Sequence, residues 1–372
     1  MERIDQIFHR INENSNRFLG YPLAKDFDYS EFAPFLNLCI NNVGDPESPS
    51  TLSIDTKDIE KEVISFFADT LESSIEDVWG YVTNGGTEGN LYGLYLARES
   101  FNDPIVYYSE ATHYSVKKNL HLLGLRSIVV RSRSNGEMDY NDLESLLTLH
   151  RDKPAIFFLN IGTTMTEAVD NIDHIKEIIE KYAIKDYYIH CDAAFLGCIA
   201  PFVDPKPKFD FSEGVDSISI SGHKFIGGPI PCGIVLTKRK HRNRIVNSVS
   251  YVGTLDTTIT GSRNGLTPLF LWSFIKKHGK KGLIERARKS QEVAAYTENR
   301  LKEIGVYAWR NNEALTVVFD KPSVALCEKY QLASEGKIAH IICVPGIEKE
   351  EIDVFINEYE EELVGSKLEA VL

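Results

Sequence analysis

The chain has 372 residues, of which 43% are hydrophobic and 26% are charged, and its formal net charge is −13. This is the composition of an ordinary globular protein, and the acidic balance argues against nucleic acid or an anionic membrane as the main partner. No apolar run approaches the length of a membrane span, and six cysteines without a CxxC pair favour free thiols in a reducing cytoplasm. We therefore expect a cytoplasmic protein that acts on neither membranes nor nucleic acid.

Apolar, β-branched runs alternate with helical patterns along most of the chain. After a charged amphipathic helix at residues 1–15, the predicted strands are 78–82, 104–109, 127–132, 154–161, 186–192, 216–221 and 232–237. The helices predicted between them are 87–100, 113–124, 139–150 and 171–183. Such alternation predicts an α/β fold with a mostly parallel seven-stranded sheet and helices on both faces, the last two strands being a candidate antiparallel pair. Ligands then belong at the carboxyl ends of the strands.

The sequence divides into three parts. Residues 1–50 are predicted to form an N-terminal arm, residues 51–265 a large α/β domain, and residues 266–372 a smaller α+β domain. The smaller domain begins with a long helical stretch, at about 266–304. The basic octet at 237–244 is interpreted as a solvated helix face.

A glycine turn follows the first predicted strand. Gly85, Gly86 and Thr87 stand between that strand and the helix at 87–100. Glycines at a strand–helix turn let backbone N–H groups approach an anion, and the helix N-terminus attracts negative charge. The GGxxG spacing lacks the GxGxxG and GK[ST] patterns, so it favours a single phosphate over a dinucleotide. A tight turn without a ligand is the alternative.

Two charged side chains stand where later strands end. Asp192 follows an apolar strand, so its carboxylate is expected to be partly buried and paired, with a helix N-cap as the alternative. Lys224 lies in a turn with Gly222, Gly227 and Gly228. We interpret these glycines as clearing space for a flat group beside the amine, and a snorkelling lysine at the sheet edge is the alternative.

Two further residues complete the set at the strand ends. His113 opens a helix after the second strand, and Thr163 follows the fourth. A phosphate cradle, a carboxylate, an imidazole, a hydroxyl and one amine together match pyridoxal phosphate, which is held by a lysine Schiff base and an acidic partner for its pyridinium nitrogen. A metal site in "IHCDAAFLGC" is disfavoured, because Cys191 faces away from its two neighbours on a strand.

The chain contains, in order, the segments "WGYVTNGGTEGN", "YYSEATHYSVKK", "NGEMDYNDL", "NIGTT", "DYYIHCDAAFLG", "PFVD", "SISGHKFIGGPIPCGIV" and "TITGSRNGLTPLFLW". In these segments it resembles the bacterial pyridoxal-phosphate-dependent histidine decarboxylases, of the group II amino-acid decarboxylase family and fold type I. The resemblance implies a fold type I PLP-dependent transferase-like fold, the conversion of L-histidine to histamine and CO2, and a homodimer, or a tetramer, with shared active sites.

Plant serine decarboxylases are similar over the same segments. An L-serine decarboxylase that forms ethanolamine, or another PLP-dependent carbon–carbon lyase, is therefore the alternative. A phosphate-binding scaffold without catalysis is disfavoured, because Lys224, Asp192 and His113 are all present.

The resemblance also implies a role for each matching residue. Lys224 would bind the cofactor aldehyde, and Asp192 would pair with the pyridine nitrogen. His113 would stack on one face of the ring, and Ala194 would pack on the other. The phosphate would be held by Gly85, Gly86, Thr87, Ser221 and His223.

Three roles concern positions nearer the edge of the expected site. Thr163 would support Asp192 or the ring hydroxyl of the cofactor. Ser262 would reach the phosphate bound by the neighbouring subunit, and Tyr251 would protonate the carbanion.

The expected substrate preference is for L-histidine over L-serine and over aromatic amino acids. The segments "CINNVGD" and "VYAWRNN" resemble the bacterial histidine enzymes. Asn41, Asn42 and Asp45 are polar groups that we expect to bond an imidazole, and a site built in this way rejects side chains that leave its polar groups unpaired.

Overall fold

The computed structural model of the chain describes residues 1–249 and 253–369, which fold as two compact units. The large unit comprises Phe27–Thr164 and Ala168–Glu285. The small unit comprises Met1–Asp26, Met165–Glu167 and Arg286–Leu372. The predicted boundaries at residues 50 and 265 therefore differ from the boundaries of these units.

Aromatic packing accounts for the difference. Within the large unit, Tyr29 and Phe32 of the N-terminal arm pack on Phe270, with ring centroids 4.6 and 5.6 Å apart respectively. The arm beyond Asp26 and the first part of the long C-terminal helix thus share a hydrophobic cluster, and neither separates from the large unit.

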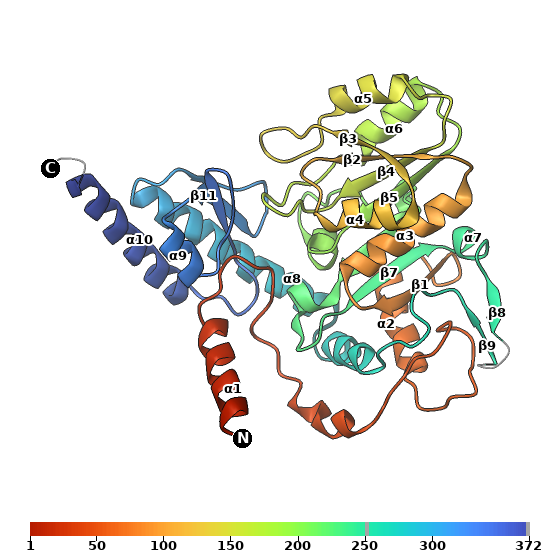
Figure 1. Cartoon of the computed structure of the whole chain (residues 1–372), viewed down its shortest axis with the longest axis horizontal. Helices are drawn as coiled ribbons and strands as arrows, with labels where there is room; N and C mark the ends of the chain where they lie inside the picture. The colour runs from red at the N-terminus through yellow and green to blue at the C-terminus, as the bar shows by residue number, and fades with distance from the viewer. Residues whose placement is uncertain (250–252, 370–372) are drawn as a thin grey trace. The chain divides into compact units, whose positions relative to one another are not determined.

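In the described part of the large unit, seven strands form one sheet in the order β1-β7-β6-β5-β4-β2-β3 (Figure 1). From β3 to β6 all neighbours run parallel, whereas β7 runs antiparallel to both β6 and β1. The strands are β1 (Val78–Thr83), β2 (Ile105–Ser109), β3 (Arg126–Val130), β4 (Ala155–Asn160), β5 (Tyr187–Asp192), β6 (Ser217–Ser221) and β7 (Gly233–Lys238). This arrangement confirms the predicted sheet and its antiparallel last pair.

Helices connect most of these strands. The helices of the large unit are α2 (Lys57–Thr70), α3 (Gly86–Ser100), α4 (Ser115–Leu123), α5 (Tyr140–Thr148), α6 (Ile172–Lys181) and α7 (Arg239–Arg242). Asp139 caps α5, because its carboxylate accepts hydrogen bonds from the backbone N–H groups of Asn141 and Asp142. The short 3₁₀ segments are η1 (Ser30–Asn37), η2 (Leu196–Cys198), η3 (Ala200–Phe202) and η4 (Phe211–Glu213).

The alternating serines of "SISIS" in β6 face glycines of α3. An added Cβ atom would meet a serine hydroxyl oxygen at each of three positions: 2.8 Å from Ser221 at Gly86, 2.2 Å from Ser219 at Gly89, and 2.9 Å from Ser217 at Gly93. Any larger side chain there would push the helix away from the sheet. The glycines therefore set the close approach that brings the start of α3 to the end of β6.

The turn between β6 and β7 carries Lys224. It forms a π-helical segment, η5 (His223–Gly227), and Gly227 has a φ of 88°, which favours glycine. An added Cβ at Gly222 would lie 2.7 Å from a methyl carbon of Leu271. This packing corrects the interpretation that Gly222 clears space beside the amine, because that space is filled by a leucine.

The small unit contains a four-stranded antiparallel sheet among its described residues, in the order β10-β11-β13-β12. Its strands are β10 (Ala308–Trp309), β11 (Thr316–Asp320), β12 (Ala333–Glu335) and β13 (Ile338–Ile342), and its helices are α1 (Glu2–Ser15), α9 (Val324–Lys329) and α10 (Lys349–Glu369). Helix α8 (Leu266–Glu303) is interrupted at Gly279 and enters this unit at Arg286. A separate pair, β8 (Asn247–Val249) and β9 (Thr254–Asp256), runs antiparallel in the large unit.

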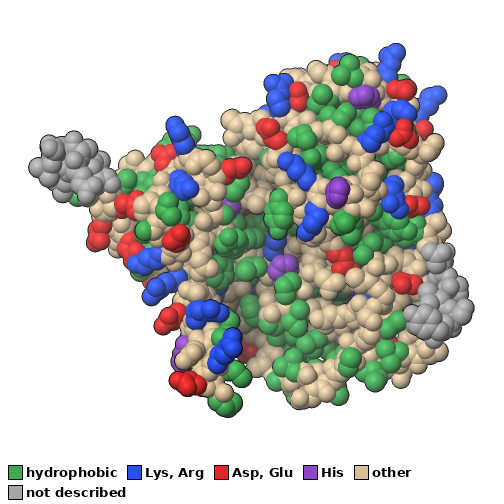
Figure 2. Space-filling view, in the orientation of Figure 1, with side chains coloured by type: hydrophobic (Ala, Val, Ile, Leu, Met, Phe, Trp, Pro, Cys, Tyr) green, Lys and Arg blue, Asp and Glu red, His purple; other side chains and the backbone are tan. Residues whose placement is uncertain are grey.

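The basic octet at 237–244 is not a solvated helix face. His241 and Arg242 are buried, and the Arg242 guanidinium pairs with the Asp45 carboxylate. His241 Nε2 lies 3.0 Å from Asp216 Oδ1. On the face shown in Figure 2, basic and acidic side chains are interspersed. None of the helices in the described part of the chain has the length and apolarity needed to cross a membrane.

Candidate active site

The expected site residues follow strand ends that meet at one edge of the sheet. Strands β2, β4, β5 and β6 run parallel, and β1 shares their direction because β7 is antiparallel to both β1 and β6. Asp192 is the last residue of β5, and Gly85, His113, Thr163 and Lys224 each follow the carboxyl end of another of these strands. In sheets of this kind the carboxyl edge is where ligands bind.

Asp192 is buried at the end of β5, and both of its carboxylate oxygens accept hydrogen bonds. Oδ1 accepts from the backbone N–H of Ala194 at 3.0 Å, and Oδ2 accepts from Asn90 Nδ2 at 2.7 Å. Asp192 is not a helix N-cap, because the next helical segment, η2, begins at Leu196 and has Phe195 as its N-cap. The first contact is a local turn, and the second joins Asp192 to α3. These two bonds fix the carboxylate plane.

Lys224 is half-buried in the turn after β6, and its amine has no hydrogen-bond partner among the described residues. Burial lowers the pKa of Lys224 below its ordinary value, and the negative charge of Asp192 opposes that shift. A larger fraction of the amine is therefore unprotonated at neutral pH than in an exposed lysine, which suits a nucleophile that must attack an aldehyde.

His113 lies within electrostatic range of both groups. Burial lowers the pKa of His113, Asp192 opposes the shift, and the positive charges of Lys224 and Lys118 add to it. The imidazole is held by Ser115, whose Oγ lies 2.8 Å from His113 Nδ1. A neutral, oriented imidazole at the start of α4 is the result.

The glycine turn lies against the ends of β5 and β6. A Cβ atom at Gly86 would meet Ser221 Oγ at 2.8 Å and the Ala194 methyl carbon at 3.1 Å, and one at Gly85 would lie 3.8 Å from the His223 ring. Thr87 is exposed in the first turn of α3. The structure thus brings the predicted phosphate-binding residues together around the N-terminus of α3, an end of a helix that favours an anion.

Thr163 holds a turn after β4. Its Oγ1 accepts a hydrogen bond from the backbone N–H of Ala168 at 2.9 Å, and its own N–H donates to the Ala168 carbonyl at 2.9 Å. The hydroxyl thus stabilises the turn that follows the strand next to β5.

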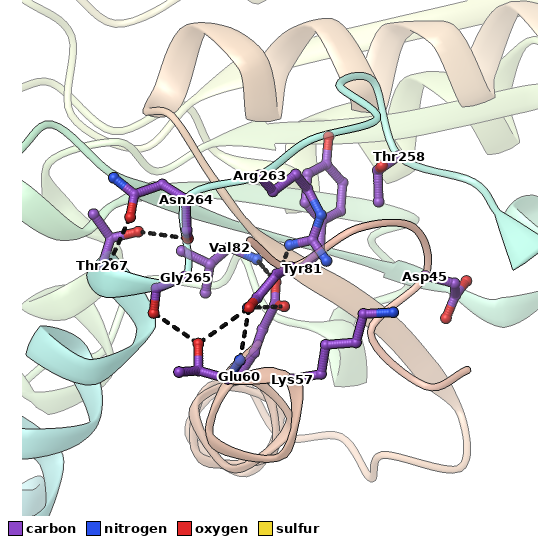
Figure 3. Close-up of polar contacts among 12 residues, drawn as sticks. Asp45, Lys57, Glu60, Tyr81, Val82, Thr258, Arg263, Asn264, Gly265 and Thr267 are labelled. Atoms are coloured by element: carbon purple, nitrogen blue, oxygen red, sulfur yellow. Dashed lines mark hydrogen bonds and ion pairs between the residues drawn. The ribbon is translucent and has the colours of Figure 1, made fainter. Parts of the chain in front are cut away.

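Ser262 is exposed, and its hydroxyl accepts a hydrogen bond from Asn41 Nδ2 at 3.1 Å. The next residue, Arg263, is buried and forms an ion pair with the Glu60 carboxylate (Figure 3). Glu60 also accepts a hydrogen bond from the backbone N–H of Val82 in β1, at 2.7 Å. The segment that carries Ser262 is therefore anchored to α2 and to the sheet.

The prediction that the arm binds an imidazole is wrong for two of its three residues. Asn42 and Asp45 are fully buried. Asn42 donates a hydrogen bond to Glu60 Oε2 at 2.9 Å, and Asp45 accepts one from Thr257 Oγ1 at 2.8 Å. Both side chains belong to the internal hydrogen-bond network around Arg263 and Arg242. The sequence does not reveal this role, because the burial of polar residues in an irregular segment leaves no pattern.

Tyr251 lies outside the described residues. Among the residues that are described, no group of three or more His, Cys, Asp or Glu side chains is arranged to hold a metal ion. A hollow lined by Asp77, Val78 and Lys238 lies at the start of β1 and the end of β7. That is the sheet edge opposite to Asp192, so it is not the candidate site.

Sequence reasoning missed Asn90 and Asn119. Asn90 bonds Asp192, and Asn119 Nδ2 donates to the Thr87 carbonyl at 3.0 Å. The signal for Asn90 was its position in α3. It lies four residues after Gly86 and directly after Gly89, on the side of the helix that meets the sheet. A buried amide on such a face requires a polar partner.

Residues 94–320 match the pyridoxal-dependent decarboxylase conserved domain. The chain belongs to this family. It is 44% identical over 356 residues to a histidine decarboxylase of Mesorhizobium japonicum, covering 96% of each chain. It is 45% identical over 359 residues to a histidine decarboxylase of Pseudomonas entomophila, covering 96% of this chain and 89% of the relative.

A solved L-methionine decarboxylase from Streptomyces sp. 590 superposes with a TM-score of 0.90 at 27% identity, over 97% of this chain and 94% of the other. The predicted fold type, the predicted cofactor and the predicted reaction class are thereby confirmed. The protein is a pyridoxal-phosphate-dependent amino-acid decarboxylase.

The residues at the strand ends fit the cofactor of this decarboxylase. The turn at Gly85 and Gly86 has no room for a Cβ at its second position and lies at the N-terminus of α3, which favours a phosphate. Asp192 presents a fixed, buried carboxylate to a pyridinium nitrogen, and the amine of Lys224 is without a hydrogen bond among the described residues. The donor set is the one that pyridoxal phosphate requires.

Proposed function

We propose that this decarboxylase acts on L-histidine and releases histamine and CO2. The observation that carries the proposal is the identity of 44–45% to proteins named histidine decarboxylase over 96% of this chain. The solved methionine decarboxylase is less similar, at 27% identity.

The roles of the site residues are part of the proposal. When bound, pyridoxal phosphate supplies a sink for the electron pair left at Cα when CO2 departs. Lys224 would hold the cofactor covalently until the substrate amine takes its place. Asp192 would hold the proton on the ring nitrogen by its charge, and His113 and Ala194 would orient the ring.

The phosphate contacts belong to Gly85, Gly86, Thr87, Ser221 and His223. Buried and glycine-lined surroundings strengthen hydrogen bonds to a dianion. Thr163 supports the strand end beside Asp192, and Tyr251 would donate the proton that replaces the carboxylate at Cα.

We also propose a homodimer in which Ser262 contacts the phosphate bound by the partner. This is supported by the exposure of Ser262 on a segment that Arg263 anchors firmly. A cytoplasmic location is supported by the cysteines, all six of which are free thiols.

The test is a competition between substrates. CO2 release and kcat/KM are measured at one pH for L-histidine, L-serine, L-methionine and L-phenylalanine with the protein reconstituted with cofactor. The proposal expects kcat/KM for L-histidine to exceed the others by on the order of a hundredfold or more, because a site that hydrogen-bonds a substrate side chain rejects analogues that leave its own polar groups unpaired. Equal or greater efficiency with L-serine would show that the substrate assignment is wrong.

A further inference from the structure

The Asp192 carboxylate ends a chain of buried hydrogen bonds. Asn90 Nδ2 lies 2.7 Å from Asp192 Oδ2, and Asn90 Oδ1 lies 2.9 Å from His190 Nε2. His190 Nδ1 in turn lies 2.7 Å from Ser217 Oγ. Asp192 is 7% exposed, Asn90 2%, and the other two side chains not at all. This series of hydrogen bonds links α3, β5 and β6.

The direction of every bond in this chain follows from the carboxylate. An ionised carboxylate only accepts, so Asn90 presents its NH2 group to Asp192 and its carbonyl oxygen to His190. That carbonyl oxygen also accepts, so His190 carries its proton on Nε2. Burial lowers the pKa of His190 to about 3, so the ring is neutral and its Nδ1 accepts from the Ser217 hydroxyl. All three donors therefore point toward Asp192.

Close packing holds the histidine in place. A Cβ atom at Gly93 would lie 2.2 Å from His190 Nδ1, so the ring occupies space that only a glycine on α3 leaves open. On the other side, the Phe158 ring centroid lies 5.0 Å from that of His190. The imidazole cannot turn without moving the helix, so the orientation of the Asn90 amide is fixed as well.

We propose that Asn90 is a positioning residue for the Asp192 carboxylate, and that His190 and Ser217 fix the orientation of the Asn90 amide. This inference rests on the proposed role of Asp192 as the partner of the cofactor's ring nitrogen. Asn90 stabilises the negative charge on Oδ2 and holds the carboxylate plane before the cofactor enters. Successive bonds in one direction polarise each other, which strengthens the last of them.

The test uses the apoprotein titrated with pyridoxal phosphate and the visible circular dichroism of the bound cofactor, which reports the orientation of its ring. Asn90→Leu removes the donor to Asp192 at similar volume. We expect the dissociation constant to rise on the order of ten- to a hundredfold, and the dichroism per bound cofactor to fall. Unchanged values for both would overturn the proposal.

A pair of variants at His190 separates orientation from packing. His190→Gln keeps an N–H group near the Asn90 carbonyl, whereas His190→Leu removes it. We expect the glutamine variant to keep cofactor affinity and dichroism near those of the wild type, and the leucine variant to resemble Asn90→Leu. If both variants behave alike, His190 does not act through the Asn90 amide.

The matched control is Thr316→Val. Thr316 is also buried, and its hydroxyl donates to a buried carboxylate, that of Glu167, in the small unit. A rise in the dissociation constant equal to that of Asn90→Leu would mean general destabilisation and would refute the positioning role.

Asp192→Asn tells the two proposals apart. If that change leaves affinity and dichroism unaltered, the proposed role of Asp192 fails. If it alters them while Asn90→Leu does not, only the positioning role fails.

Discussion

The electrostatics of single residues in the site follow from burial and from a few neighbouring charges. His113 illustrates this, because its pKa is lowered first by burial and then by Lys224 and Lys118, against the opposing effect of Asp192. A histidine in these surroundings is neutral at pH 7, where its ring can stack without the cost of a buried charge.

Removing one of those cations tests this description. Lys118→Met is expected to raise the pKa of His113 toward its ordinary range, because a positive charge that disfavours the imidazolium is lost. The measurement is an NMR titration of the His113 ring in the apoprotein. Lys117→Met is the control, since Lys117 is equally exposed on α4 but does not act on His113. A pKa that stays the same or falls in Lys118→Met would contradict the account.

The groups at strand ends, such as Lys224 and Asp192, could be identified from the sequence, because a charged residue after an apolar strand is a recognisable local pattern. Sequence reasoning missed Asn90, whose partner is 102 residues away. It also misjudged Asn42 and Asp45, since burial in an arm without regular structure leaves no periodic pattern in the sequence.

At the scale of elements, the segment that carries Ser262 depends on one buried ion pair. Arg263 and Glu60 have side chains 3% and 0% exposed. Removing the arginine leaves Glu60 with two hydrogen bonds, from Asn42 and Val82, but without its ion-pair partner. The pair therefore couples the segment to α2 and to β1.

Arg263→Met is expected to lower the free energy of unfolding by about 3–5 kcal/mol, because a buried carboxylate loses its ion-pair partner. Lys276→Met breaks a pair with Glu62 whose side chains are 54% and 50% exposed, and it should cost about 0–1 kcal/mol. Equilibrium denaturant unfolding of both variants provides the comparison. Equal, small effects would mean that the Arg263 pair does not hold the segment.

The order and the type of the main elements could be predicted because their patterns are strong. All seven strands of the large sheet lie within two residues of their predicted ranges. The unit boundaries could not be predicted, because they depend on which aromatic residues of the arm pack against Phe270. One of these residues, Tyr29, lies 241 positions before Phe270 in the sequence. Long-range packing of this kind leaves no local signal.

At the scale of the whole molecule, the proposed homodimer makes a distinctive prediction. Lys224→Ala and Ser262→Asp subunits are each expected to be inactive, the second because its carboxylate repels the cofactor phosphate. A mixture of the two should recover activity. In each mixed dimer, one site combines Lys224 of the Ser262→Asp subunit with the unchanged Ser262 of the Lys224→Ala subunit. Activity in the mixture no greater than the sum of its parts, or an active monomer in sedimentation, would contradict shared sites.

The central claim is that the carboxyl edge of the large sheet is a pyridoxal phosphate site built around Lys224. The measurement that tests it most directly is borohydride reduction of the protein with bound cofactor, followed by mass mapping of its peptides. We predict a stable pyridoxyl group on Lys224 in the wild type and none in Lys224→Ala. A group found on Lys117 or Lys118 instead, or one that persists in Lys224→Ala, would contradict the account.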